Sequence, residues 1–136
     1  DNTWHHIVGV CDQDANLIYL YLDGVEVDTT SYTDNSAINP TNLAIGSRGP
    51  GDAEFWDGSI DEVAIWNTAL SAGDIAALYE ARGTSDLNDD GNSANLVGWW
   101  RMGDGDTFPT ITDNSTNSND GTMTNMTASD IVKDTP

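Results

Sequence analysis

The sequence predicts an all-β domain of antiparallel strands with one short helix. Several short segments alternate apolar and polar residues with the period of a strand, whereas helical spacing of apolar residues occurs in one segment. An Asp-Gly pair between two strand-like segments is typical of a tight hairpin. Five Trp, four Tyr and an apolar content of 38% in 136 residues can supply a hydrophobic core, so we expect a folded domain despite the high charge.

The first three predicted strands follow one another closely. Residues 4–10 alternate between two faces, and the polar residues 12–16 then supply a turn. Residues 17–22 are apolar on both faces and form the second strand. Because Asp23-Gly24 tolerates the positive φ angles of a tight hairpin, residues 25–27 begin the third.

Two further strands are expected before the helix. Leu43 to Ser47 is the fourth, and Ser59 to Trp66 is the fifth. Alternation along the fifth strand predicts that Asp61 and Glu62 point to opposite faces.

The helix is predicted near residues 71–82. Ser71 with Asp74 makes an approximate capping box, and Ile75 and Leu78 recur at helical spacing until Gly83. Residues 83–95 then hold almost nothing to bury and are interpreted as a linker or loop.

The remaining chain begins with a Trp-rich segment, residues 96–102. Its apolar side chains need a partner surface, so we expect it to pair with the sheet that contains Trp4 or with Ser59 to Trp66. Residues 110–128 are dominated by Thr, Asn, Ser, Asp and Gly, and their order would require docking or a bound ion.

Charge excludes several partners. The chain has 4 Lys+Arg against 23 Asp+Glu, a formal net charge of -19, so it lacks the cations that bind nucleic acid or anionic membranes. No apolar run approaches the roughly 20 residues of a membrane-spanning helix, so we expect no membrane insertion. The single cysteine, Cys11, excludes an intramolecular disulfide.

Five sequence blocks in a fixed order point to a known family. They are Trp4-His5-His6-Ile7-Val8, Tyr21-Leu22-Asp23-Gly24, Leu43-Ala44-Ile45-Gly46, Phe55-Trp56-Asp57-Gly58-Ser59-Ile60-Asp61-Glu62-Val63-Ala64-Ile65-Trp66 and Ala69-Leu70-Ser71. This order resembles the C-terminal half of laminin G-like, concanavalin A-like jelly-roll domains. The resemblance implies a jelly-roll sandwich of two antiparallel sheets.

A second set of blocks looks like the start of the same kind of domain. It comprises Leu96-Val97-Gly98-Trp99-Trp100, Asp113-Asn114-Ser115 and Asn117-Ser118-Asn119-Asp120-Gly121-Thr122. We therefore divide the chain into a jelly-roll core (1–82), an acidic linker (83–95) and a returning strand with a polar loop (96–136). The last part either completes a circularly permuted or otherwise incomplete sandwich or starts a second repeat of a tandem array.

The resemblance also implies a Ca²⁺ site. Such jelly rolls often hold the ion between an Asp- and Asn-rich loop and the Ile-Asp-Glu strand, which here means Asp113, Asn117, Asn119 and Asp61. The alternative is that these side chains make Asx-turns and bind loop amides.

The tryptophans divide into two predicted groups. Trp4, Trp66 and Trp99 occupy core-like positions, whereas Trp56 and Trp100 are the expected exposed pair for stacking on sugar rings. Catalysis is not expected, because the Glu-x-Asp-x-x-Glu strand of the laminarinase relatives of this fold is absent from the sequence.

Two functions are compatible with these features. The first is a non-catalytic recognition module, outside the cell, on a cell surface or on a virion, that binds glycan or protein with the help of Ca²⁺. The second is a structural decoration domain that contributes oligomer contacts to a larger particle or appendage, such as a phage fibre. Function lies in the site rather than in the fold, so the fold cannot choose between them.

Overall fold

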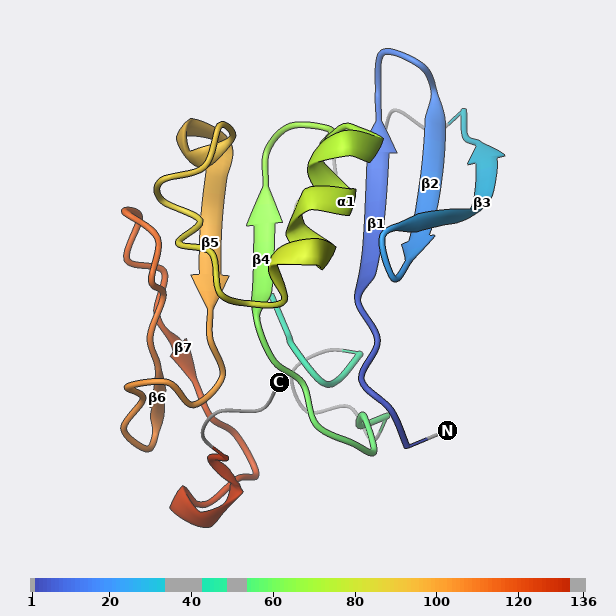
Figure 1. Cartoon of the computed structure of the whole chain (residues 1–136). Helices are drawn as coiled ribbons and strands as arrows, with labels where there is room; N and C mark the ends of the chain where they lie inside the picture. The colour runs from blue at the N-terminus through green and yellow to red at the C-terminus, as the bar shows by residue number, and fades with distance from the viewer. Residues whose placement is uncertain (1, 34–42, 49–53, 133–136) are drawn as a thin grey trace.

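The computed structural model describes residues 2–33, 43–48 and 54–132, and it consists mainly of antiparallel strands with one short helix (Figure 1). In chain order the elements are β1 (Ile7–Asp12), β2 (Leu17–Leu22), β3 (Val25–Ser31), β4 (Val63–Trp66), α1 (Ala72–Ala81), β5 (Leu96–Trp100), β6 (Thr110–Ile111) and β7 (Gly121–Thr122). Short 3-10 helices occupy Ser93–Asn95 and Ala128–Asp130. The predicted combination of antiparallel strands and one helix is confirmed.

The first sheet is the expected meander β1-β2-β3. Its first strand begins at Ile7, and Ile7 pairs with Leu22. The hairpin between β2 and β3 turns at Asp23 and Gly24, whose φ angles are 51° and 78°. These positive values are those that a type I′ hairpin requires, so the Asp-Gly prediction is confirmed.

The second sheet joins β4 to β5 across a long sequence separation. The two strands are antiparallel, with Val63 opposite Trp100 and Ile65 opposite Gly98. Of the two partners predicted for the segment after residue 95, the strand ending at Trp66 is therefore the one with which it pairs. A third, two-stranded sheet pairs β6 with β7.

Two predicted strands are wrong in whole or in part. Residues 43–47 form no strand, and only an isolated bridge joins Ser47 to Phe55. Gly46 has a φ of 77°, which turns the chain out of an extended path. The strand predicted from Ser59 begins only at Val63, because Glu62 has a φ of 49° and interrupts the extended run.

The helix is capped as the sequence predicts. The Ser71 hydroxyl accepts a hydrogen bond from Asp74 N (3.2 Å), and the Asp74 carboxylate accepts one from Ser71 N (3.0 Å). Hydrogen bonds from the Ser71 side chain and backbone hold the pKa of Asp74 below its ordinary value. The helix ends at Arg82, which is left-handed with a φ of 48°.

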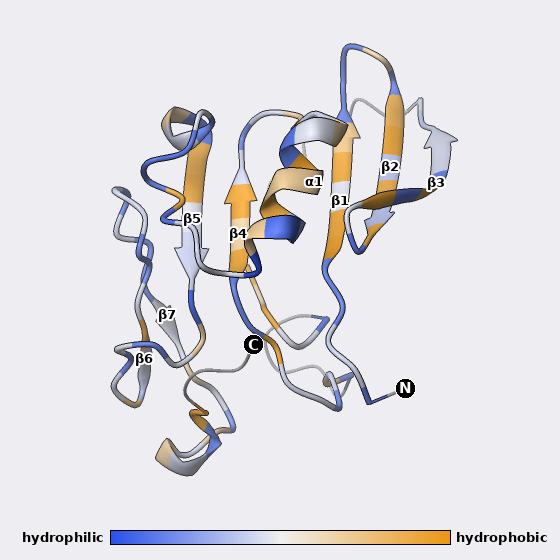
Figure 2. Ribbon diagram, in the orientation of Figure 1, coloured by the Kyte–Doolittle hydropathy of each residue, from blue (hydrophilic) through white to orange (hydrophobic). Residues whose placement is uncertain are grey.

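One helix covers the same face of both larger sheets. Ile75 of α1 packs with Val10 and Tyr21 of the first sheet, whereas the second sheet contributes Leu96 and Trp99 to a neighbouring apolar cluster. Two residues, Trp66 and Leu78, pack against both clusters. The two sheets therefore form one layer beneath α1 (Figure 1), and the most apolar parts of this layer lie in β1, β2, β4 and β5 (Figure 2).

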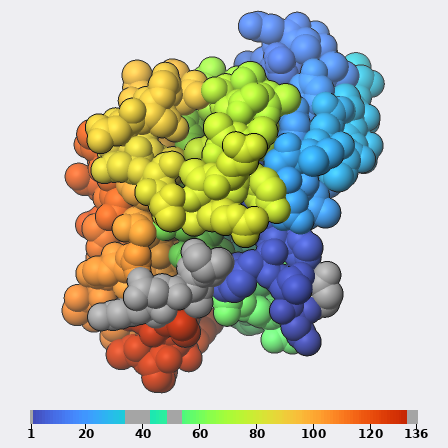
Figure 3. Space-filling view, in the orientation of Figure 1, coloured from blue at the N-terminus to red at the C-terminus, as the bar shows by residue number. Residues whose placement is uncertain are grey.

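The segment after the helix is less solvated than predicted. Leu87 lies within residues 83–95, which were expected to bury almost nothing, yet it is buried with Leu96 and Trp99. The space-filling view shows α1 and this segment, in yellow-green and yellow, lying between the N-terminal strands and the C-terminal segment (Figure 3). Leu87 therefore docks the segment on the apolar surface that β5 supplies.

Candidate functional site

A cavity of about 1660 Å³ separates the two sheets and is here called the β1–β4 groove. Residues 3–14 line it on the β1 side, and Trp56 with residues 59–70 line it on the β4 side. Leu78 and Tyr79 of α1 contribute to its lining. The groove thus brings together the first and fourth strands, which are far apart in the sequence.

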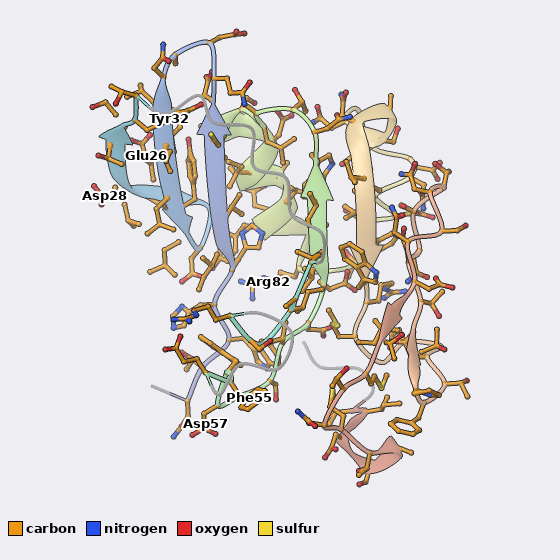
Figure 4. The ribbon with its side chains drawn as sticks, turned by 180° about the vertical axis from the view of Figure 1, so that it is seen from behind. Glu26, Asp28, Tyr32, Phe55, Asp57 and Arg82 are labelled. Atoms are coloured by element: carbon orange, nitrogen blue, oxygen red, sulfur yellow. The ribbon has the colours of Figure 1, made fainter. Side chains whose placement is uncertain are left out.

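Two exposed aromatic side chains line this groove. Trp56 is 61% exposed and Trp4 is 45% exposed, and both line the groove. Phe55, also exposed, lies beside Asp57 in the segment that leads to β4 (Figure 4). We call Trp4 and Trp56 the aromatic rim; their exposed rings present flat apolar faces next to polar groups.

The prediction of an exposed Trp56 is confirmed, but Trp4 was assigned to the core, which is wrong. Trp4 precedes the start of β1 at Ile7, so the alternation of the strand does not determine where its side chain points. The only sequence signal that could have shown this is the adjacent pair His5-His6, which is unusual for a buried strand.

Asp23 fixes the path of the chain between Trp4 and β1. Its carboxylate accepts a hydrogen bond from the backbone N–H of His6 (2.9 Å) and lies 2.9 Å from Nδ1 of His5. These two bonds hold the pKa of Asp23 below its ordinary value. The ring of His6 stacks on Tyr79 of α1 with centroids 6.0 Å apart, and burial lowers the pKa of that imidazole. The N-terminal side of the rim is therefore anchored to the hairpin and to the helix.

The prediction of an exposed Trp100 is wrong. This side chain is 5% exposed, and its indole N–H donates to the carbonyl of Asn119 (2.9 Å). Its ring lies over Gly98, where an added Cβ would come within 2.4 Å of the indole. The Trp100 ring is therefore packed over its own strand and against the polar loop that contains Asn119. No face of the ring is free to stack on a sugar.

Asp113, a predicted metal ligand, is the centre of a hydrogen-bonded loop. One carboxylate oxygen accepts from the backbone N–H groups of Trp99 (2.8 Å) and Ser115 (2.9 Å). The other accepts from the Ser115 hydroxyl (2.9 Å) and the N–H of Asn119 (2.7 Å). These four donors match the roughly four acceptor positions of a carboxylate. Burial raises the pKa of Asp113, but the bonds from Trp99, Asn119 and Ser115 outweigh it and hold that pKa below its ordinary value.

The two asparagines predicted as ligands lie along the outer edge of β5. Nδ2 of Asn117 donates to the carbonyl of Leu96 (2.7 Å), and Nδ2 of Asn119 donates to the carbonyl of Val97 (2.8 Å). Together with Asp113 these side chains satisfy backbone groups that an edge strand would otherwise expose. The polar loop therefore binds this edge of β5 largely through side-chain hydrogen bonds, where a neighbouring strand would use backbone hydrogen bonds.

Asp61, the fourth predicted ligand, lines a different cavity of about 400 Å³ together with Glu62, Arg101 and Asp104. The structure thus brings together three of the four predicted ligands in one loop. Over residues 2–33, 43–48 and 54–132, no group of three or more His, Cys, Asp or Glu residues gathers as a metal site. The Ca²⁺ site remains a prediction.

Glu62 connects the segment before β4 to β5, a role that no pattern in the sequence predicts. Its carboxylate accepts from Nε1 of Trp99 (2.7 Å) and from Nε of Arg101 (2.9 Å), and Nη2 of Arg101 also binds Asp104 (2.7 Å). The left-handed backbone of Glu62 aims the side chain at these partners. Strand alternation, which assumes an extended backbone, could not have predicted it.

Comparison with known families identifies the class of protein to which this chain belongs. A model of the concanavalin A-like lectin/glucanases superfamily matches residues 1–76, more than half of the 136 residues. The chain therefore belongs to this superfamily, which confirms the laminin G-like resemblance and the sandwich fold class. No curated protein and no solved structure matches the chain.

No helix in the described part of the chain has the length and apolar character needed to cross a membrane.

Proposed function

We propose that this domain is a non-catalytic recognition module that binds glycan at the aromatic rim, outside the cell, on a cell surface or on a virion. The observation that carries the proposal is that Trp4 and Trp56 are both exposed and both line the β1–β4 groove. The apolar faces of pyranose rings pack on aromatic rings, and Ser59 and Asp61 in the same groove lining supply hydroxyl and carboxylate groups for sugar hydroxyls.

The bonding of two acidic side chains, Glu62 in the groove lining and Asp113 in the polar loop, supports a binding rather than a hydrolytic role. Glycoside hydrolysis needs two carboxyl groups about 5 to 9.5 Å apart that can exchange protons with the substrate. Glu62 is already bound to Trp99 and Arg101, and Asp113 accepts four donors within its own loop. Both carboxylates therefore have structural partners that catalysis would have to displace.

Replacing Trp56 with alanine is expected to weaken glycan binding by about thirtyfold, which corresponds to about 2 kcal/mol for a lost aromatic anchor. The measurement is a glycan array on the intact chain, followed by titration calorimetry with the best glycan. Trp56→Phe should keep part of the affinity. Phe108→Ala should keep all of it, because that exposed aromatic does not line the groove. Equal loss in Trp56→Ala and Phe108→Ala would contradict a specific role for the rim.

Calcium assistance is part of the proposal and has its own test. An ion held by Asp113, Asn117, Asn119 and Asp61 would stabilise the folded chain by about 2.7 kcal/mol at a hundredfold excess over its dissociation constant. The melting temperature should then rise in millimolar Ca²⁺ and fall in EDTA at fixed ionic strength, and Asp61→Ala should abolish the difference. Identical midpoints would mean that hydrogen bonds alone order the polar loop.

A further inference from the structure

His6 holds the segment between Trp4 and β1 against α1. Its imidazole stacks on the ring of Tyr79, with the two centroids 6.0 Å apart and the two planes inclined by 28°. Tyr79 in turn packs over Gly24 of the β2–β3 hairpin, where an added Cβ would come within 3.0 Å of the tyrosine ring. This contact therefore joins the N-terminal segment, the hairpin and the helix.

The protonation state of His6 matters because one of its ring nitrogens is buried. Nδ1 is shielded from solvent and has no hydrogen-bond partner within the described part of the chain. A neutral imidazole has one nitrogen that carries no proton, whereas both nitrogens of an imidazolium are donors. Protonation would therefore bury a donor that has no acceptor, together with part of a positive charge.

The charged and titratable groups around this ring act in opposite directions. On the hairpin, the Asp23 carboxylate accepts from the backbone N–H of His6 (2.9 Å), and its charge favours the imidazolium. On α1, the guanidinium of Arg82 lies over the Tyr79 ring, 5.7 Å from the centroid. A protonated His6 would be a second cation against the same ring. On the N-terminal segment, the other imidazole, His5, is bound to Asp23 (2.9 Å).

These surroundings favour the neutral ring in the stacked position. Burial outweighs the attraction of Asp23, so the pKa of His6 lies below its ordinary value of 6.5. Above that value the stack keeps its full stability. As pH falls through it, a His6 that has left the stack takes up a proton first, and the released arrangement gains population. Asp23 stays ionised in this range, because hydrogen bonds from His6 and His5 hold its pKa below the ordinary 3.8.

The segment that would be released carries one ring of the aromatic rim. Trp4 stands two residues before His6, and it is 45% exposed. The other ring, Trp56, belongs to a distant part of the sequence, so the contact of the N-terminal segment with α1 helps to fix the two rings relative to each other. A sugar that binds the released arrangement must order this segment again, and its affinity falls accordingly.

We propose that His6 is a pH-sensitive positioning residue of the aromatic rim. As a neutral ring it holds the segment of Trp4 against Tyr79, and when it is protonated it releases the segment and weakens glycan binding. The effect on affinity rests on the glycan binding proposed above. The release itself takes place without any ligand.

The first test follows the release without a glycan. The chain has two histidines, so the imidazole signals in NMR spectra can be assigned with the variant His5→Gln. Nuclear Overhauser contacts between the rings of His6 and Tyr79 should be present at neutral pH and should disappear as His6 is protonated. The indole N–H signals of Trp99 and Trp100, which are bonded inside the fold, should stay unchanged and so report that the chain remains folded. Ring contacts that persist in the protonated state, or a His6 that stays neutral down to about pH 5, would overturn the proposal.

The second test measures glycan affinity by titration calorimetry at about pH 7.5 and about pH 5.5. The affinity of the wild type should fall at least about threefold at the lower pH. His6→Phe keeps an aromatic ring against Tyr79 but cannot be protonated, so its affinity should be equal at the two pH values. His5→Gln is the matched control, because it removes the other imidazole and should keep the pH response of the wild type. Thermal melting at both pH values checks that the variants fold.

The outcomes separate this inference from the proposed function. A pH response that persists in His6→Phe, or one that is lost in His5→Gln, would overturn the role of His6. A glycan whose affinity depends on Trp56 but is equal at both pH values would leave the proposed function standing and would also overturn the role of His6. If no glycan binds at either pH value, the proposed function is wrong, and with it the effect of His6 on affinity.

Discussion

Asp113→Ala is expected to lower the free energy of unfolding by about 3 kcal/mol. The substitution removes the acceptor for three backbone N–H groups and one hydroxyl, and Asp113 is only 6% exposed in the folded chain. Buried donors without a partner each cost about 1 to 3 kcal/mol, which entering water reduces in part. Urea denaturation at neutral pH measures the loss.

Asp130→Ala is the matched control for this variant. Asp130 also accepts bonds from a backbone N–H and a hydroxyl, both of Thr127, but it is exposed. We expect this control to cost about 0.5 to 1 kcal/mol, as for other exposed caps. Equal losses in the two variants would contradict the central role of Asp113 in the polar loop.

The contribution of Asp113 also has a defined pH dependence. Its folded pKa lies below its ordinary value, so the unfolded chain takes up the proton first as pH falls. The stabilisation is therefore complete above the ordinary aspartate pKa of about 3.9 and is lost as pH falls from there through the folded pKa. The difference in stability between wild type and Asp113→Ala should shrink over that acidic range. A difference that stays constant would contradict the ionised carboxylate as its source.

Ile75→Ala is expected to cost about 3 kcal/mol as well, for an apolar reason. Ile75 is 0% exposed and packs with Val10, Tyr21 and Leu70 beneath α1. Removing three carbons there loses transfer free energy and leaves a cavity, which together cost about 2 to 5 kcal/mol in buried aliphatic positions. Chemical denaturation followed by circular dichroism measures the change.

Two further variants make this test specific. Ile75→Val should cost only about 1 kcal/mol, because it removes a single methyl group. Leu22→Ala should cost little, since Leu22 lies on the opposite face of the first sheet and is 38% exposed. A Leu22 variant as destabilised as Ile75→Ala would mean that the layer is covered on both faces in solution.

Elements whose causes are local were predictable from sequence. The hairpin at Asp23-Gly24 and the capping box of Ser71 with Asp74 depend on side chains within four residues of one another. That the segment starting at Leu96 pairs as a strand was also predictable, because it is too apolar to remain exposed, but the choice of β4 over β1 as its partner was not. The start of the strand ending at Trp66 was not predictable, because Glu62 leaves the extended conformation to reach Trp99 and Arg101.

The candidate site was only partly predictable for the same reason. Trp56 follows a turn-rich stretch and was correctly expected to be exposed, whereas Trp4 and Trp100 were assigned the wrong way round. Trp100 ends an apolar segment, and the backbone carbonyl of Asn119, distant in the sequence, binds its indole and so helps to bury it. Which distant residue covers a tryptophan depends on the tertiary structure and is not visible in the residues next to it.

The sequence by itself determined the class of fold, the single helix, the strong negative charge and the need of the segment starting at Leu96 for a partner strand, because alternation, capping and apolar content act over short stretches of chain. Only the tertiary structure decided that α1 covers two separate sheets, that Asp113, Asn117 and Asn119 bind the edge of β5, and that a groove lies between β1 and β4. These features depend on which backbone groups remain unpaired once the strands have formed. That information arises from the spatial order of the elements and is not contained in any one segment.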